Sequence, residues 1–149
     1  MILFHGAASL AQIGYLRLCS CIFYNSIMLK NIALVFLGGG LGSALRYWLS
    51  SWLNQYFPWA AGTFSVNILG SLLIGLLMGW FIKWPHFEAD LRLLLAVGFC
   101  GGFTTFSALA LEQANMIKNG ASLHALVYMA STAVIGVAAV FLGLWLSRQ

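Results

Sequence analysis

Four long apolar segments constrain this chain more than any other feature. They cover residues 31–53, 61–82, 91–117 and 122–146, and each is long enough for a membrane-spanning helix, which needs about 20 mostly apolar residues. Charged residues make up only 7% of the chain, against roughly 25% in a soluble globular domain. We therefore predict an all-α integral protein of the cell membrane, surrounded by lipid, with four transmembrane helices in one compact bundle.

The ends of these segments carry the expected signals. Pro58 follows the first segment, Pro85 lies among charged residues after the second, and Gly120 follows the third. Tryptophans near the segment ends are typical of interfacial anchors; they are Trp59, Trp80, Trp84 and Trp145.

Residues 1–27 fit the bundle less well. They are moderately apolar but include Gln12, Arg17 and Asn25, and they lack a convincing cleavage site of small residues. The sequence from Met28 resembles a natural amino terminus. We expect one membrane domain, residues 28–149, preceded by an extension that is either an over-extended start or an interfacial segment.

The basic residues are spread along the chain. Its net charge of +4 comes from seven Lys and Arg without a basic patch, which excludes nucleic acid as a partner. In a four-span topology Lys30, Lys83, Arg92 and Arg148 share one side, and Arg46 and Lys118 lie toward the other. This bias predicts cytoplasmic termini, and because it is modest it leaves dual insertion open.

The sequence offers no catalytic constellation. Ser107 has no membrane histidine with an orienting acid beside it, since His124 begins the last segment and His5 and His86 lie in the tail or a loop. There is also no phosphate-binding loop. The three cysteines lack the spacing of a metal site, and Cys100 is interpreted as a buried bystander. We predict that the protein is not an enzyme.

Small residues recur four positions apart within the segments. This spacing lets helix backbones approach closely where lipid provides no hydrophobic force between helices. The series are Gly38 and Gly42, then Ser71, Gly75 and Gly79, then Thr132 and Gly136, and finally Ala139 and Gly143.

Two polar residues within the spans need more than packing. Arg46 is a permanent charge, and a structural hydrogen bond combined with snorkelling is favoured over direct contact with an anion. Asn67 lies in the middle of the second span. It serves either as interhelical glue or as an N–H donor to a passing anion.

The stretch "GFCGGFTTFSALALE", residues 98–112, interrupts the third segment with glycines and hydroxyl groups. We predict two half-helices with a break at the Gly-rich midpoint of Gly98, Gly101 and Gly102. Non-helical backbone at membrane depth occurs only where protein encloses it or where it lines a water-filled cavity. The break would present carbonyls to a cation and amide hydrogens to an anion, which predicts an ion site at mid-membrane.

Three motifs together resemble the CrcB/Fluc family of fluoride channels from Met28 to the end. They are "GGGLGSALRYWL" (residues 38–49), "GTFSVNILGS" (62–71) and "GFCGGFTTFS" (98–107). The resemblance implies an antiparallel dual-topology dimer with two fluoride pathways and a central structural sodium ion. It implies a passive channel that exports fluoride and lowers its toxicity in the cytoplasm, through weak donors placed in series.

The resemblance also implies roles for individual residues. Backbone carbonyls of Gly101 and Thr104 would bind sodium, and pairing of two subunits about a two-fold axis would supply four such oxygens. The fluoride pathway would comprise Asn67, Thr105, Phe106, Ser107 and Glu112, with Arg46 in a structural role on the anion side.

Some positions depart from the family pattern. Leu109 stands where a second pore phenylalanine is usual, Ala108 replaces a threonine, and the fourth span is apolar after Thr132. One pathway would then be poor or closed, so we favour a heterodimer with a paralogous subunit slightly over a homodimer.

Two other functions compete. A non-conducting or half-active partner subunit would account for Leu109. A small multidrug exporter would need a carboxylate in the first span, where the sequence has Arg46 and no acid.

Overall fold

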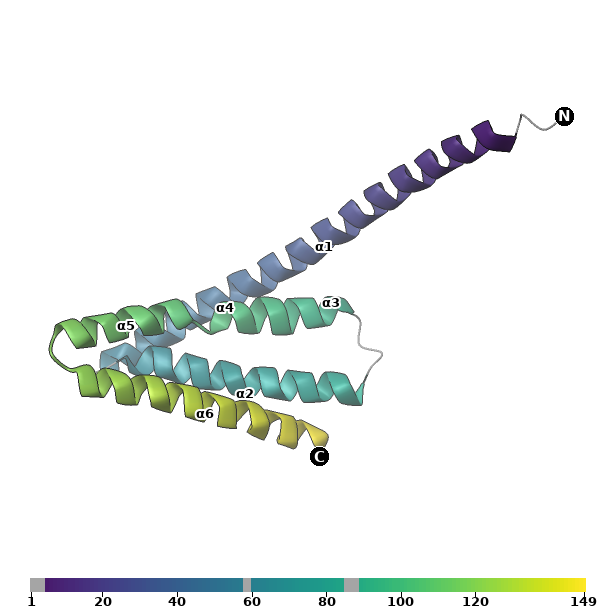
Figure 1. Ribbon diagram of the computed structural model, residues 1–149. Coiled ribbons are helices and arrows are strands. Elements are labelled where there is room, and N and C mark those ends of the chain that lie inside the picture. Colours follow the sequence, from purple (N-terminus) through teal and green to yellow (C-terminus); the bar gives the residue numbers. More distant parts are fainter. Residues whose placement is uncertain (1–4, 58–59, 85–88) are drawn as a thin grey trace. The chain divides into compact units, whose positions relative to one another are not determined.

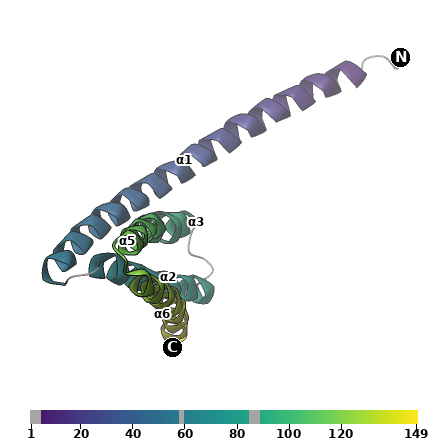
Figure 2. The same ribbon diagram turned by 60° about the vertical axis from the view of Figure 1, so that its left-hand side comes forward.

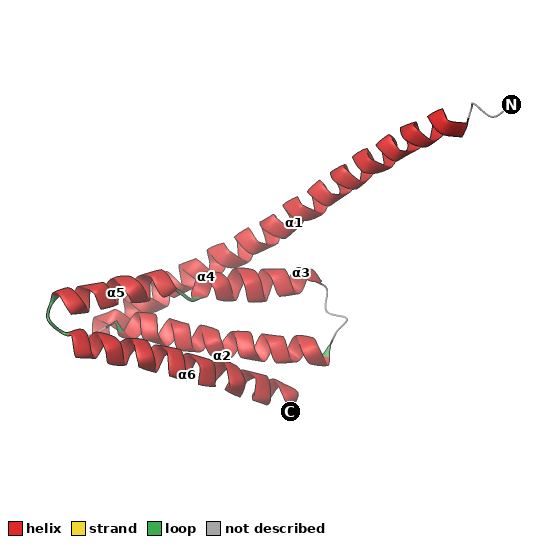
Figure 3. Cartoon of the chain, in the orientation of Figure 1, coloured by secondary structure: helices red, strands yellow, loops and turns green. Residues whose placement is uncertain are grey.

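The computed structural model describes residues 5–57, 60–84 and 89–149, with side chains from Asn25 onward. Within these residues all regular structure is helical, and no strand is present (Figure 3). The predictions for Pro58, Trp59, Pro85 and His86 fall outside the described residues, as does the side chain of His5.

The helices follow one another with short connections (Figure 1). Their bounds are α1 His5–Tyr56, α2 Ala61–Lys83, α3 Ala89–Arg92, η1 Leu93–Cys100, α4 Gly101–Phe103, α5 Phe106–Lys118 and α6 Ser122–Arg148. The η1 segment is a π-helix, continuous with α3 before it and α4 after it.

The predicted four-span topology is confirmed within the described residues. Four helical segments are long and apolar enough to cross a membrane, namely Asn25–Tyr56, Ala61–Lys83, Ala89–Lys118 and Ser122–Arg148. Each contains the span predicted from sequence and extends it by a few residues at one or both ends. The protein is therefore a multi-pass membrane protein.

The chain divides into two compact units, Met1–Ala33 and Leu34–Gln149. Helix α1 contributes residues to both. All the ion-site residues predicted from sequence belong to the second unit.

Helices α2 and α6 lie side by side along their length, as two views agree (Figures 1 and 2). The contact is between backbones: a Cβ atom at Gly75 would overlap the carbonyl oxygen of Val140, and one at Gly143 would overlap that of Leu72. The small-residue packing predicted from sequence is confirmed at this pair, where only glycine permits such close approach.

The third span packs equally closely against α1. A Cβ atom at Gly42 would overlap the carbonyl oxygen of Phe99, and one at Gly102 would overlap that of Gly39. Glycines of the 98–102 stretch therefore serve the contact between α1 and the third span. This contact holds the third span in place just before its interruption.

Candidate functional site

The third span is interrupted at Thr104 and Thr105. Both have extended backbone, with φ −87° and ψ 156° at Thr104 and φ −150° and ψ 121° at Thr105. Gly101 has helical dihedral angles of −63° and −37°, and Gly98 and Gly102 also lie within helical segments. The prediction that the helix breaks at the glycines is therefore wrong in position. Close packing against α1 explains Gly98 and Gly102, and the helix ends after them.

The two threonine hydroxyls help to terminate the flanking helices. Thr104 donates from both its backbone nitrogen and its Oγ1 to the carbonyl oxygen of Cys100, each at 3.0 Å. Thr105 is the N-cap of α5, since its Oγ1 accepts from the backbone nitrogen of Ala108 at 3.2 Å. Such a cap satisfies one of the free amide hydrogens of the first helical turn. Ser107 Oγ lies 3.2 Å from the same Thr105 oxygen.

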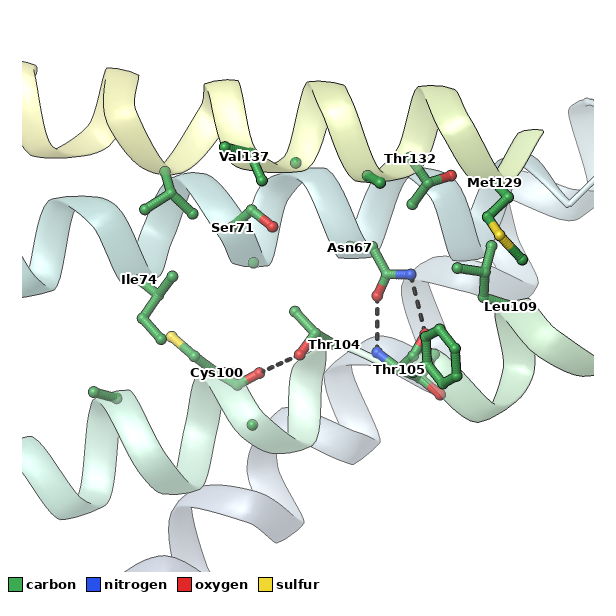
Figure 4. Close-up of a pocket in the computed structure, with 17 residues that line it drawn as sticks. Asn67, Ser71, Ile74, Cys100, Thr104, Thr105, Leu109, Met129, Thr132 and Val137 are labelled. Atoms are coloured by element: carbon green, nitrogen blue, oxygen red, sulfur yellow. Dashed lines mark hydrogen bonds between the residues drawn. The ribbon is translucent and has the colours of Figure 1, made fainter. Parts of the chain in front are cut away.

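Asn67 of α2 pairs with the backbone of Thr105 through both polar atoms of its side chain (Figure 4). Its Nδ2 donates to the Thr105 carbonyl oxygen at 3.0 Å. The Thr105 backbone nitrogen donates to Asn67 Oδ1 at 2.8 Å. The carboxamide therefore pairs with the N–H and the C=O of Thr105, as a neighbouring peptide group would in a regular helix. The second hydrogen of Nδ2 has no acceptor among the residues that the structure describes.

The carbonyl oxygen of Gly102 accepts hydrogen bonds from two side chains of α1. It accepts from Arg46 Nε at 3.1 Å and from Ser43 Oγ at 3.3 Å. A helix end leaves its last carbonyls without intrahelical donors, and these two side chains supply one of them with partners. Arg46 thus has a hydrogen bond to the interruption itself. Its anion-side role stays a prediction.

Other carbonyl oxygens at the interruption have no donor among the described residues. No hydrogen bond from these residues is made to the oxygen of Gly101, Phe103 or Thr104. Gly101 is exposed, and a Cβ atom placed on it would meet no atom within 4 Å. The interruption thus leaves three backbone carbonyl oxygens that accept no hydrogen bond from a described residue, and Gly101 is the exposed one of the three residues.

A cavity of about 490 Å³ opens beside the interruption (Figure 4). Asn67 and Ser71 of α2 line one wall, and Thr104, Thr105 and Phe106 line another. The wall from α6 consists of Met129, Thr132, Ala133, Gly136, Val137 and Val140. Asn67, Gly101, Thr104, Thr105 and Phe106, all predicted from sequence, thus meet at one cavity.

Phe106 and Leu109 both border this cavity but differ in burial. The Phe106 side chain is 74% exposed in the single chain, whereas Leu109 is 6% exposed. Leu109 contributes an aliphatic wall without a ring edge. The α6 wall offers little polarity, because Thr132 Oγ1 donates to the Tyr128 carbonyl of its own helix at 2.7 Å.

Glu112 lies away from this cavity, in a separate hydrogen-bonded cluster. Its Oε1 accepts from Thr63 Oγ1 at 2.6 Å and its Oε2 accepts from the Tyr128 hydroxyl at 2.9 Å. The Tyr128 hydroxyl also lies 3.3 Å from the Ala60 carbonyl oxygen. Tyr128 is not among the site residues predicted from sequence. The available signal was a phenol within an apolar span, which usually requires a hydrogen-bond partner.

Glu112 also borders a second cavity, of about 470 Å³, near the α5–α6 connection. Its lining is richer in amides and comprises Asn54, Ala60, Glu112, Asn115, Met116, Asn119 and Ala121. Ser107 borders neither cavity and is connected to the interruption through Thr105. The structure thus brings most predicted residues to one cavity and places Glu112 at another.

Comparison with known proteins gives consistent results. Residues 33–144 match the family model described as CrcB-like protein, Camphor Resistance (CrcB). A relative named Fluoride-specific ion channel FluC, from Phocaeicola vulgatus, is 42% identical over 124 residues, covering 80% of this chain and 100% of the relative.

Other relatives with the same name show similar likeness. The protein from Hyphomonas neptunium is 43% identical over 81% of this chain and 98% of its own length. That from Gloeothece citriformis is 44% identical over 80% of this chain and 98% of its own length. The match therefore extends over nearly the whole of each relative.

Proposed function

Since this chain belongs to the CrcB-like family, we propose that it is a fluoride-selective ion channel that lets fluoride leave the cell passively. The relatives named above carry the name of fluoride-specific ion channels. The observation that supports the proposal best is the cavity at the interrupted span, where an amide, a hydroxyl and an aromatic ring meet. No energy source is required, because hydrogen fluoride that enters an acidified cell dissociates in the cytoplasm and the trapped anion leaves through the channel.

The proposed pathway replaces the hydration of fluoride with weak donors. Asn67 has one free N–H, Thr105 has a hydroxyl group, and the edge of the Phe106 ring carries positive quadrupole. None of these is a fixed charge that would trap the anion. Conduction needs binding that is favourable enough for entry and weak enough for exit.

Ser107 and Glu112 are proposed to continue the pathway toward the second cavity. Ser107 is coupled to Thr105 through the 3.2 Å contact between their oxygens. Glu112 receives donors from Thr63 and Tyr128, which offset part of its negative field. An anion therefore passes near a carboxylate whose two oxygens are already engaged.

A structural sodium ion is proposed at the interruption. The carbonyls of Gly101 and Thr104 fit this ion, because hard cations take oxygen ligands and neither carbonyl has a donor among the described residues. When bound, the ion would supply a fixed positive charge near mid-membrane. Two chains paired in antiparallel orientation would contribute four such oxygens.

A dimer is proposed as the functional form. Its support is the exposure of Gly101 and Phe106, which in a single chain would lie against lipid although both are assigned to ion handling. Backbone carbonyls without donors do not persist against lipid. An antiparallel pair would enclose them.

A second candidate is a half-active subunit that conducts fully only beside a paralogous partner. It is favoured by the buried Leu109 at the cavity and by the apolar α6 wall beyond Thr132. In this case one pathway of the pair lacks a ring and a row of hydroxyls.

The test is fluoride efflux from liposomes that contain only this purified chain, with chloride as the comparison anion. We expect fluoride-selective efflux that is lost in Phe106→Ile and kept in Phe141→Ile, a change at an exposed residue of α6. No efflux from the chain alone, restored by a paralogous subunit, would favour the half-active form. No efflux in either case would refute the channel proposal.

A further inference from the structure

The hydrogen bonds at the interruption change partners at a single residue. In an α-helix each backbone N–H donates to the carbonyl four residues earlier. Thr104 still follows this rule, since its nitrogen lies 3.0 Å from the carbonyl oxygen of Cys100. The next donor, the N–H of Thr105, should by the same rule reach the carbonyl oxygen of Gly101.

Asn67 accepts that hydrogen instead. The Thr105 nitrogen lies 2.8 Å from Asn67 Oδ1, a side-chain oxygen of another helix (Figure 4). The Gly101 carbonyl therefore loses its helical donor, and no other described residue supplies one. The second bond, from Asn67 Nδ2 to the Thr105 oxygen at 3.0 Å, fixes the plane of the carboxamide and makes the exchange of partners specific.

We propose that Asn67 is a positioning residue for the cation site: by accepting the Thr105 N–H it frees the Gly101 carbonyl to bind sodium. This inference rests on the proposed function, because the sodium ion belongs to it. It gives Asn67 a role separate from contact with fluoride. One side chain then serves the anion pathway through its free N–H and the cation site through its oxygen.

The alternative is that Asn67 only joins α2 to the third span. In that case its loss lowers stability equally with and without sodium. The Gly101 carbonyl would stay without a donor even when Asn67 no longer accepts the Thr105 N–H. If Asn67 does control this carbonyl, its loss allows Thr105 N–H to return to Gly101. The sodium dependence of stability then changes, and that quantity separates the two possibilities.

The test is thermal unfolding of the full-length purified protein in detergent, as sodium chloride replaces choline chloride at constant ionic strength. A bound ion raises the stability of the folded state according to its concentration and its dissociation constant. The readout is the sodium concentration that gives half of the maximal stabilisation. It does not depend on fluoride transport.

Two substitutions separate the acceptor from the rest of the side chain. Asn67→Leu keeps the branched shape and removes the oxygen, and we expect the sodium midpoint to rise at least about tenfold or the stabilisation to disappear. Asn67→Asp keeps an acceptor for Thr105 N–H, and we expect a midpoint no more than about threefold higher than in the unsubstituted chain. If Asn67→Leu does not yield a folded species, Asn67→Ala removes the same oxygen with a smaller side chain.

Asn54→Leu is the matched control. Asn54 Oδ1 also accepts a backbone N–H, that of Gly62, at 2.8 Å, but this bond lies away from Gly101. Its loss should lower overall stability without moving the sodium midpoint.

The proposal is overturned if Asn67→Leu keeps the normal midpoint, or if Asn67→Asp and Asn67→Leu lose the sodium effect equally. It is also overturned if the unsubstituted chain shows no sodium stabilisation. Fluoride efflux by the same unsubstituted preparation in liposomes then judges the channel function separately.

Discussion

The hydroxyl group of Tyr128 on α6 donates to Oε2 of Glu112 on α5 across 2.9 Å. Thr63 of α2 donates to the other oxygen of the same carboxylate at 2.6 Å. Three helices are thereby joined at one charged group inside a membrane bundle. Hydrogen bonds to a charged acceptor contribute more than those between neutral groups.

We expect Tyr128→Phe to destabilise the fold by about 0.6–1.7 kcal/mol, the range for hydrogen bonds between transmembrane helices. The ring stays and only the donor to Glu112 is lost. Thermal unfolding in detergent measures the change, and Tyr56→Phe, at a position 65% exposed, is the control. Equal stability of both variants would contradict the importance of this bond.

Arg46→Lys should weaken the anchoring of the interruption to α1. Lysine lacks the Nε donor that lies 3.1 Å from the Gly102 carbonyl oxygen, and its ammonium group cannot reproduce the planar guanidinium. We expect a loss of about 1 kcal/mol in unfolding free energy. Arg148→Lys, at the exposed end of α6, should change nothing measurable. A loss of the same size in both variants would show that replacing any arginine by lysine lowers stability, whether or not the bond to Gly102 is present.

Gly42→Ala should disrupt the packing of α1, because the added Cβ overlaps the Phe99 carbonyl oxygen, an atom of the backbone that cannot move aside alone. We expect destabilisation of about 1–3 kcal/mol, as for other overpacked sites. Gly40→Ala, with open space around its Cβ, should be neutral or slightly stabilising. Unfolding curves of the two variants provide the comparison, and neutral behaviour of Gly42→Ala would show that the two backbones are less closely packed.

Leu109→Phe should increase fluoride efflux several-fold in liposomes, because it adds a ring edge to the cavity next to Phe106. Leu111→Phe, at a residue that is exposed and outside the cavity lining, is the control and should leave the rate unchanged. Unchanged or lower efflux from correctly folded Leu109→Phe would mean that a second ring does not limit conduction.

The four spans could be predicted because length and absence of charge are properties of each segment alone. For the third span, the predicted residues 91–117 lie within Ala89–Lys118. The close contact of α2 and α6 could also be predicted from the spacing of small residues. Gly75 and Gly143 both lie where the two backbones meet.

The position of the interruption depended on a distant residue. Asn67 lies 38 positions before Thr105, and its carboxamide replaces the helical partner of that residue. Glycine content pointed to the right region but to the wrong residues, because Gly102 is needed for contact with Gly39. Local composition could not distinguish a glycine that ends a helix from one that packs it.

Of the Glu112 cluster, only the glutamate could be predicted from the sequence. The glutamate was assigned through resemblance, but its donors Thr63 and Tyr128 come from two other helices. Asn67, Thr105 and Phe106, which line one cavity, could all be named from the sequence because they belong to two short motifs, and their role in fluoride passage stays a prediction.

The glycine contacts that join α2 to α6 and α1 to the third span have a consequence for the time course of the ionic current. Where Gly75 and Gly143 join α2 to α6, and Gly42 and Gly102 join α1 to the third span, backbone meets backbone. Backbone groups have no rotamers to exchange, so these contacts hold the helices in one arrangement. Single-channel records should therefore show long, steady openings with few closures, and a flickering current would point to a side chain that lines the cavity, such as Phe106 or Met129.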